Sequence, residues 1–249
     1  MFLSRRTMQA EYFDSERPAQ EVAQFYRSLG RVNQFFDFAE PFRKLLPLLL
    51  QETECRSLSI LDVGAGDGSL GRTMERWAAG RGWNWRVANL DCSLAALSLN
   101  AGAKNVAGSA TQLPFRQGSF DIVMASQMAH HLTDTEVRLL LQETWRVARR
   151  AVVLCDLHRN IGLYLLLRVL FCFQKHPASF RADGLLSVKR GWRVEELLTL
   201  ARQAGIPEAK ATLRFGTRVV LHAEKLPRKA NEGISRNGGP ALLRLSKPA

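Results

Sequence analysis

The spacing of hydrophobic residues changes near residue 57. Before that point, from Pro18 to Gln51, apolar side chains recur every three or four positions, the spacing of helices that bury one face. Pro41 and Pro47 are expected to mark boundaries or kinks, because proline disrupts the interior of a helix. The pattern predicts a helical lead-in.

Beyond residue 57, short apolar runs of strand length alternate with amphipathic stretches. Helices are expected at Ser69–Ala79, Ser93–Asn100 and Asp134–Ala148. The runs predict five strands, Ser57–Gly64, Trp85–Asp91, Asn105–Gly108, Phe120–Ser126 and Ala151–Asp156. Strands separated by helices are joined by crossovers and lie parallel. The order predicts a Rossmann-like, doubly wound α/β sheet.

The alternation breaks after the fifth strand. Leu157–Lys189 is expected to be an irregular insertion that covers a pocket, with one apolar helix at Ile161–Phe173. That helix contains Arg168 and is shorter than the roughly 20 residues that span a bilayer, so we interpret it as buried or pocket-lining.

The segment from Val194 onward returns to regular patterns. A helix is predicted at Val194–Ala204. Ala209–Phe215 and Thr217–Lys225 follow as two strand-like runs joined across Gly216, which predicts an antiparallel hairpin at the sheet edge.

Composition agrees with a globular protein and adds a strong basic charge. The chain has 249 residues, 46% of them hydrophobic and 23% charged, with a formal net charge of +12. Acidic partners such as RNA, phospholipid surfaces or anionic metabolites therefore have to be considered. We expect a lead-in or lid at 1–56, a main domain at 57–225 with a cap insertion at 157–190, and a poorly ordered basic tail at 226–249.

Cysteine usage and the N-terminus indicate the compartment. Cys55, Cys92, Cys155 and Cys172 are scattered without a C-x-x-C pair, so neither a disulfide framework nor a zinc site is expected. The N-terminal sequence lacks the apolar segment of an export signal. These features predict a cytoplasmic protein without a transmembrane segment.

The most informative segment runs from Ile60 to Leu70, ILDVGAGDGSL. An apolar strand leads into alternating glycines and then into a helix, whose free N–H groups can face a ligand. The next strand ends in Asp91, whose carboxylate can accept hydrogen bonds from the two hydroxyls of a ribose. A nucleoside-containing cofactor is implied.

Two cofactors compete for this turn. Gly66–Gly71 satisfies the G-x-G-x-x-G pattern of nicotinamide dinucleotide sites, with Asp91 at the expected distance. Asp62 and Asp67, however, bring negative charge to the place where a pyrophosphate would lie. A cationic cofactor with an ammonium, a sulfonium and a ribose, S-adenosylmethionine, matches these charges better than NAD.

The order of motifs resembles the class I S-adenosylmethionine-dependent methyltransferases. LDVGAGDGSL is similar to their glycine motif, and NLDCS (Asn89–Ser93) is similar to their second acidic motif. Gly108–Val123 resembles their "G-D-A-x-x-L-P-F … G-S-F-D-x-V" segment. The resemblance spans about Leu58 to Lys225 and points to the small-molecule branch, methyltransferase types 11 and 25, which includes quinone-biosynthesis enzymes. It implies a seven-stranded sheet with one antiparallel strand from the C-terminal hairpin.

The resemblance also implies a cofactor site. Gly64, Gly66 and Gly68 would approach the methionine and ribose, Asp91 would hold the ribose hydroxyls, and Asp62 would orient the turn. Ser109 stands where the family usually has an Asp near the adenine, so adenine recognition would fall to the backbone of Ala110 and to packing by Cys92 or Leu113. The remaining expected contacts are Ala65, Ser126, Gln127 and Arg31.

Methyl transfer to a hydroxyl needs a group that accepts its proton. A phenol is mostly neutral at pH 7, and histidine is the side chain that titrates nearest to that pH. His130 and His131 follow the fourth strand, and His158 follows the fifth, at the edge where the cofactor is expected. We favour His131 and His158 as the residues that reach the pocket. His176 is expected in a solvated loop, and His222 is expected to be structural.

The expected acceptor is a small, aromatic or otherwise apolar metabolite, methylated at oxygen. The phenylalanines between residues 35 and 42 and the apolar helix of the insertion favour such an acceptor, either as core residues or as a lid. Nucleic acid is not favoured, since no Asn-Pro-Pro-Tyr motif follows the fourth strand. An RNA-modifying methyltransferase, a non-catalytic cofactor-binding protein and, last, a nicotinamide oxidoreductase stay open as alternatives. The oligomeric state is not predicted.

Overall fold

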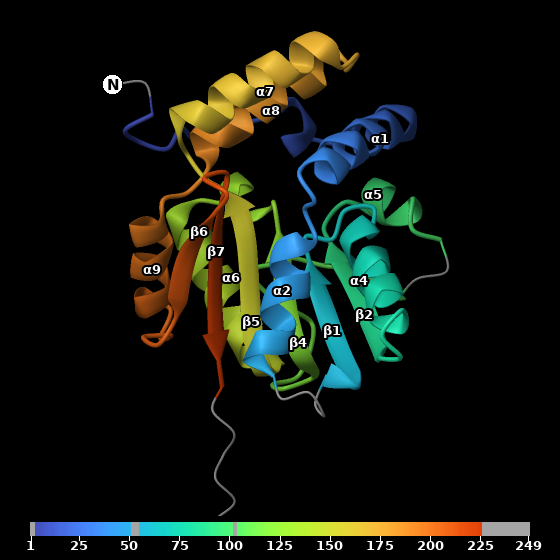
Figure 1. Ribbon diagram of the computed structural model, residues 1–249, viewed down its shortest axis with the longest axis vertical. Coiled ribbons are helices and arrows are strands. Elements are labelled where there is room, and N and C mark those ends of the chain that lie inside the picture. Colours follow the sequence, from blue (N-terminus) through green and yellow to red (C-terminus); the bar gives the residue numbers. More distant parts are fainter. Residues whose placement is uncertain (1–2, 51–54, 102–103, 226–249) are drawn as a thin grey trace, which may run out of the picture.

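A seven-stranded sheet forms the centre of the computed structural model, which describes residues 3–50, 55–101 and 104–225. The strand order is β3-β2-β1-β4-β5-β7-β6 (Figure 1). The strands are β1 (Ser57–Val63), β2 (Asn84–Asp91), β3 (Lys104–Ala107), β4 (Phe120–Ser126), β5 (Ala148–Leu157), β6 (Lys210–Arg214) and β7 (Arg218–Glu224). The five predicted strands and the hairpin are confirmed.

The hairpin gives the sheet its antiparallel strand. β7 pairs antiparallel with both β5 and β6, whereas β1, β2, β3, β4 and β5 pair parallel with one another. Phe215 and Gly216 both have positive φ, which closes the turn between β6 and β7. The sheet is the α/β arrangement that the sequence pattern predicts.

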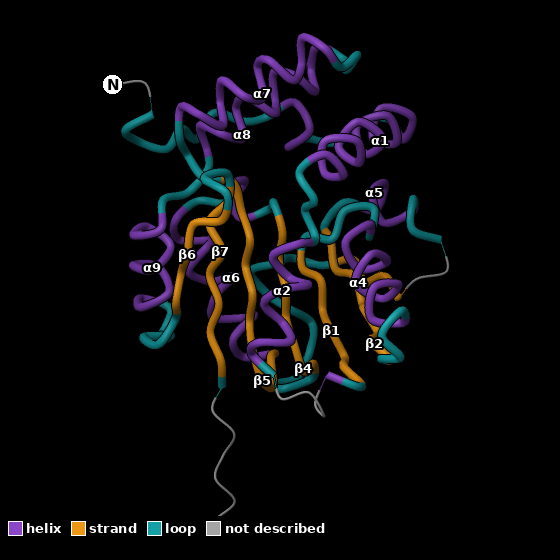
Figure 2. The backbone as a smooth tube through the Cα atoms, viewed as in Figure 1, coloured by secondary structure: helices purple, strands orange, loops and turns teal. Residues whose placement is uncertain are grey.

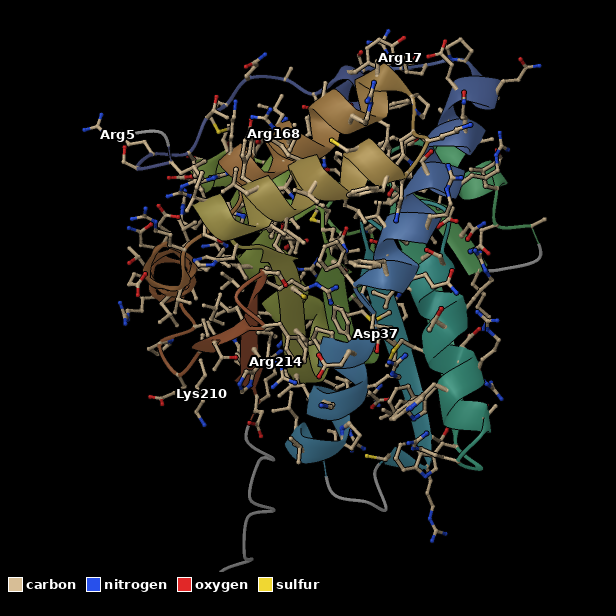
Figure 3. The ribbon with its side chains drawn as sticks, turned by 45° about the horizontal axis from the view of Figure 1, so that its top comes forward. Arg5, Arg17, Asp37, Arg168, Lys210 and Arg214 are labelled. Atoms are coloured by element: carbon tan, nitrogen blue, oxygen red, sulfur yellow. The ribbon has the colours of Figure 1, made fainter. Side chains whose placement is uncertain are left out.

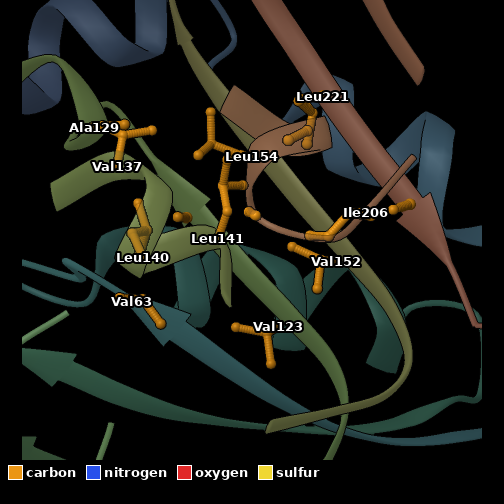
Figure 4. Close-up of a cluster of buried hydrophobic side chains, with 14 of the residues drawn as sticks. Val63, Val123, Ala129, Val137, Leu140, Leu141, Val152, Leu154, Ile206 and Leu221 are labelled. Carbon is orange, nitrogen blue, oxygen red and sulfur yellow. The ribbon is translucent and has the colours of Figure 1, made fainter. Parts of the chain in front are cut away.

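Alternation along the strands buries both faces of the sheet. Ile60 and Ile122 pack with α2 (Glu40–Leu49) and α4 (Ser69–Ala79), whereas their neighbours Leu61 and Val123 pack toward α6 (Asp134–Val147) and α9 (Val194–Gln203). Figure 4 shows the second cluster, with Leu140 and Leu141 of α6 against the strands.

Three helices form a cap above the sheet. These are α1 (Ala19–Phe35), α7 (Ile161–Phe173) and α8 (Ala178–Arg190), and they lie together at one end of the molecule (Figures 1 and 2). We call this group the cap. The lead-in therefore divides, because α1 belongs to the cap while α2 packs on the sheet through Phe42 and Leu46.

The structure differs from the predicted elements in three places. The insertion contains a second helix, α8, which the sequence pattern did not predict. Its sequence is only weakly amphipathic and has Gly184 near its centre. The helix expected at Ser93–Asn100 is a single short turn of helix, α5 (Leu94–Ser98). Pro47 lies inside α2 and does not end it. The predicted tail at 226–249 lies outside the described residues.

No helix in the described part of the chain combines the length and the apolar character that crossing a membrane requires.

Candidate active site

A cavity of about 990 Å³ lies between the cap and the carboxyl ends of β1, β2, β4 and β5. This is the edge at which open α/β sheets bind ligands. The glycine turn lines one part of the cavity, and apolar side chains from the cap line another. The cavity therefore has a polar region and an apolar chamber.

The glycine turn has the backbone shape that only glycine adopts easily. Gly64, Gly66 and Gly68 have φ values of 71°, 56° and 69°. A Cβ atom added at Gly66 would lie 2.5 Å from Oη of Tyr26, and one added at Gly64 would lie 2.6 Å from Cγ of Met128. The turn is a narrow cradle beneath Tyr26, which comes from α1.

Asp91 is held in place by this turn. Its Oδ2 accepts a hydrogen bond from the backbone N–H of Gly66 at 2.7 Å, and its Oδ1 accepts one from Ser93 at 2.8 Å. Each carboxylate oxygen has a second lone pair for a ligand hydroxyl. The position of Asp91 suits the predicted ribose contact.

Asp62 places an unsatisfied carboxyl group at the same turn. It is 1% exposed and lines the cavity, and its Oδ2 has no hydrogen-bond partner among the described residues. Burial, together with Asp91 and Asp67, raises the pKa of this carboxyl well above its ordinary value. A bound cation would relieve that cost. The orphaned oxygen and the glycine cradle therefore fit the cationic S-adenosylmethionine better than a pyrophosphate.

Most of the other predicted cofactor residues line the cavity. This is true of Ala65, Cys92, Ser109, Ala110, Ser126 and Gln127. Ser109 shares its hydroxyl with Thr111 Oγ1 at 2.8 Å, so part of its hydrogen-bonding capacity is already used.

Ser126 and Gln127 extend the polar region at the end of β4. The Oγ of Ser126 is buried and has no hydrogen-bond partner in the part of the chain that the structure describes, which leaves it available to a ligand. Gln127 has a φ of 53° and donates from Nε2 to Asn33 of α1 at 3.1 Å. This bond ties the cap to the sheet across the cavity.

Two predicted cofactor residues do not line the cavity. A Cβ added at Gly68 would overlap the side chain of Asn100. This glycine therefore shapes the turn without facing the cavity. Arg31 is exposed on α1 and donates to the backbone oxygen of Lys175 at 3.3 Å. The structure places Arg31 on the outer side of the cap.

The chamber beneath the cap is apolar. The side chains that face it come from α1, α7 and α8, namely Val22, Phe25, Leu29, Val32, Leu163, Leu167, Phe171 and Phe180. Phe36 and Phe38, after α1, also line the cavity, whereas Phe42 is in the core and Phe35 is exposed. The chamber suits an apolar or aromatic guest.

His130 forms a buried pair with Asp156. His130 Nδ1 lies 2.7 Å from Asp156 Oδ1, and its backbone N–H donates to Asp156 Oδ2 at 2.9 Å. Burial raises the pKa of Asp156, but the charge and hydrogen bonds of His130 outweigh it, so the pKa ends below its usual range. The ionised Asp156 therefore fixes the proton of His130 on Nδ1.

His131 has a corresponding partner, Asp14, from the short 3-10 helix η1 (Tyr12–Asp14). His131 Nδ1 lies 2.6 Å from Asp14 Oδ1, and Arg190 Nη1 donates to Asp14 Oδ2 at 2.5 Å. These two groups outweigh the desolvation of Asp14 and lower its pKa. His131 lines the cavity with 34% of its side chain exposed, and we assign its lone pair to Nε2.

Arg190 and Glu11 complete the cluster. Arg190 also donates to the backbone oxygens of His130 and His131, at 3.0 and 2.8 Å. Glu11 lies with Oε1 3.9 Å from His130 Nε2 and accepts a hydrogen bond from Ser187 at 2.9 Å. Burial raises the pKa of Glu11 to about 7.

One group among the described residues could hold a metal ion. Donor atoms of Glu11, His130 and His131 all lie within 4.8 Å of one another. The guanidinium of Arg190, however, lies 3.8 Å from Glu11 Oε1 and would repel a divalent ion there. We therefore interpret the cluster as an acid–base site.

The other histidines lie elsewhere. The structure corrects the expected placement of His158, which lies outside the cavity with Nδ1 3.1 Å from the backbone oxygen of Gly216. The expectation of a solvated loop for His176 is wrong, because this residue is 8% exposed and stacks on Phe180. His222 lies in β7, outside the cavity.

Several site residues were not expected from the sequence. Glu11, Asp14 and Tyr26 come from the lead-in, and Arg190 comes from α8, far from the motifs in the chain. Their patterns carry no local signal of a site. Among them, only Tyr26 lies on a helix that the periodicity predicted.

Comparisons with known proteins agree with this geometry. Residues 61–155 match a family model described as a methyltransferase domain. A search of curated proteins found no match.

Solved structures share the fold at low sequence identity. The plantazolicin methyltransferase BpumL in complex with SAH is 12% identical with a TM-score of 0.62, over 83% of this chain and 90% of BpumL. A SAM-dependent methyltransferase from Aquifex aeolicus is 14% identical with a TM-score of 0.58, over 85% and 100%. The magnesium protoporphyrin IX methyltransferase of Synechocystis, with bound SAH, is 15% identical with a TM-score of 0.50, over 76% and 83%.

Proposed function

Because the chain carries a class I S-adenosylmethionine-dependent methyltransferase domain, we propose that it methylates a small apolar or aromatic metabolite at a hydroxyl oxygen. The observation that carries the proposal is a single cavity with three parts. It joins the glycine turn and its carboxylates, the apolar chamber, and the His131–Asp14 pair.

The residues of the turn would hold the cofactor. Asp91 would accept hydrogen bonds from the ribose hydroxyls, and Asp62, through its unpartnered Oδ2, would balance positive charge. When bound, S-adenosylmethionine supplies an electrophilic methyl group on a sulfonium that is itself a good leaving group. The protein's own tasks are alignment, exclusion of water and removal of a proton.

His131 is the proposed base. Asp14 holds the Nδ1 proton, so Nε2 can accept the proton of an acceptor hydroxyl, and the charged imidazole that results is stabilised by the same carboxylate. The buried His130–Asp156 pair lies beside it, with the two rings 4.1 Å apart, and positions the turn that carries both histidines.

Replacing His131 tests this role. In assays with S-adenosylmethionine carrying a labelled methyl group and a panel of phenols, His131→Ala should lower kcat by roughly 10²- to 10⁴-fold without weakening cofactor binding. The lost rate should return partly as pH rises, because the acceptor then ionises by itself. His222→Ala and His158→Ala are matched controls outside the cavity and should retain most of the activity.

An unchanged kcat in His131→Ala would remove His131 as the base while leaving the methyltransferase assignment intact. Label transferred to RNA and to none of the phenols would favour the RNA-modifying alternative, which the basic charge keeps in view. Cofactor binding with no transfer to any acceptor would favour a non-catalytic protein. We also propose a cytoplasmic location, consistent with the four scattered cysteines, which form no disulfide in the described part of the chain.

A further inference from the structure

The helix α7 is apolar on two opposite sides. Leu163, Leu167 and Phe171 are buried and line the cavity. On the other side, Ile161, Leu165, Val169 and Phe173 recur every four residues and are 53%, 51%, 55% and 84% exposed. We call these four residues the outer stripe of α7. A row of large exposed apolar side chains on one helix marks an interaction surface.

The helix that carries the outer stripe lies at one end of the molecule. Figure 1 shows α7 above α8. Both lie at the end of the molecule opposite the one where α2 ends and β1 begins. In Figure 3, which turns this end toward the reader, α7 lies in front and Arg168 is labelled on it. A flat surface could therefore meet the stripe along its length.

The charges around the stripe are positive. Arg168, Lys175 and Arg181 are exposed on or beside α7 and α8, and Arg31 of α1 is exposed and donates to the backbone of Lys175. Residues 157–182 contain no Asp or Glu. The single carboxyl group of α8, Asp183, is buried and accepts hydrogen bonds from the backbone of Tyr12 and Phe13.

We propose that the outer stripe of α7 and these cations dock the protein on an anionic phospholipid membrane. A helix with exposed apolar residues and flanking Arg and Lys lies in the plane of the headgroups, with its apolar side in the acyl region. Each cation near such a surface adds attraction to anionic lipids. The helix has 13 residues, so it rests on the bilayer and does not cross it.

A second copy of the chain fits this surface less well. A two-fold dimer through α7 would place the same patch against itself. Arg168, Lys175 and Arg181 of the two copies would then approach each other without opposing carboxylates. A surface that is both apolar and negatively charged is the complement that the residues require.

The position of α7 links the docking surface to the apolar chamber. This step of the inference rests on the proposed function. The same helix separates the apolar chamber from the docking surface. An apolar acceptor dissolved in the bilayer could then reach the chamber past α7 without entering water. A hydrophobic metabolite or lipid-like phenol is the acceptor class that this arrangement favours.

Vesicle flotation of the full chain tests the docking without any acceptor. The wild type should float with vesicles of phosphatidylcholine and phosphatidylglycerol and should float poorly with phosphatidylcholine alone. Leu165→Glu combined with Val169→Glu should weaken binding to the anionic vesicles by at least roughly 10-fold. Arg168→Glu with Arg181→Glu should weaken it to a similar extent.

The matched control is Leu48→Glu, on α2, where the leucine is 81% exposed and remote from the cap. It should bind vesicles like the wild type. Retained binding of S-adenosylhomocysteine would show that each variant is folded. Equal flotation of the wild type and the Leu165 and Val169 variant would overturn the proposal, as would no flotation at all.

A dimer in light scattering that the same two substitutions dissociate, without vesicle binding, would assign the stripe to a second copy instead. These readouts do not depend on catalysis. Vesicle binding without methyl transfer would contradict the proposed function and leave the docking proposal standing.

Discussion

Glu11 is a carboxyl group that folding places among other ionisable groups. It is 6% exposed, and burial raises its pKa from 4.5 to about 7 although His131 and Arg190 act in the opposite direction. The folded protein thus holds this proton more tightly than the unfolded chain. The stabilisation is fully present below about pH 4.5 and is lost as pH rises through 7.

The substitution Glu11→Gln removes this dependence while keeping a hydrogen-bond acceptor for Ser187. Relative to the wild type, the variant should gain stability between pH 5 and pH 8, by up to about 3 kcal/mol in the free energy of unfolding. Urea unfolding at the two pH values measures the change. Glu16→Gln, at an exposed position, should show no such gain, and a pH-independent difference for Glu11→Gln would contradict the buried placement.

The sequence predicted the residues that line the polar part of the cavity better than it predicted the partner of His131. Asp62, Gly64 and Gly66 lie in one continuous turn, so a local pattern was enough to find them. Asp14 and His131 are 117 positions apart and meet only because η1 packs against α8, beside the turn that follows β4. Local residue patterns in one sequence do not show which distant positions come into contact.

At the scale of elements, the close approach of α4 to β2 depends on Gly71. A Cβ added there would lie 2.9 Å from Cγ1 of Val87 and 3.0 Å from Oδ1 of Asn89. Gly71→Ala should therefore destabilise the protein by about 1–3 kcal/mol despite the better helix propensity of alanine.

Gly30, in α1, is the matched control for this prediction. Apart from its chain neighbours and the adjacent backbone of α1, no atom of the described residues lies within 4 Å of the position of an added Cβ. Gly30→Ala should stabilise the protein by about 0.5–1 kcal/mol through helix propensity alone. Urea unfolding of both variants checks the pair, and equal effects of the two substitutions would contradict the described packing of α4.

Element prediction succeeded where the hydrophobic period was strong and failed where it was weak. The strands and α6 have clear periods, and α6 also begins with a capping box formed by Thr133 and Glu136. α8 has Asp183 and Gly184 in its middle and few signals beyond Pro177 before it and Gly191 after it. Its stability comes from packing on α7, where Gly184 lies against the Phe171 ring.

At the scale of the whole molecule, the cap and the sheet contribute different parts of the candidate site. The sheet edge carries the glycine turn and Asp91, whose positions follow from the strand order. The cap contributes the apolar chamber and Tyr26, and it presents the outer stripe of α7, whereas Asp14 comes from η1. The fold was predictable from the strand and helix order, and a lid at 1–56 and a cap insertion at 157–190 were expected. The helix α8 and the packing of α1 against α7 and α8 were not predicted.

The central claim is that the glycine turn binds S-adenosylmethionine, and calorimetric titration tests it most directly. The full chain would be titrated with S-adenosylmethionine, S-adenosylhomocysteine and NADH, and each titration repeated on Asp91→Ala. We expect saturable binding of both sulfur compounds, no binding of NADH, and an affinity loss of roughly 10- to 100-fold in the variant, because hydrogen bonds to a carboxylate are lost. Binding of NADH alone, or sulfur-compound binding unaffected by Asp91→Ala, would contradict the account.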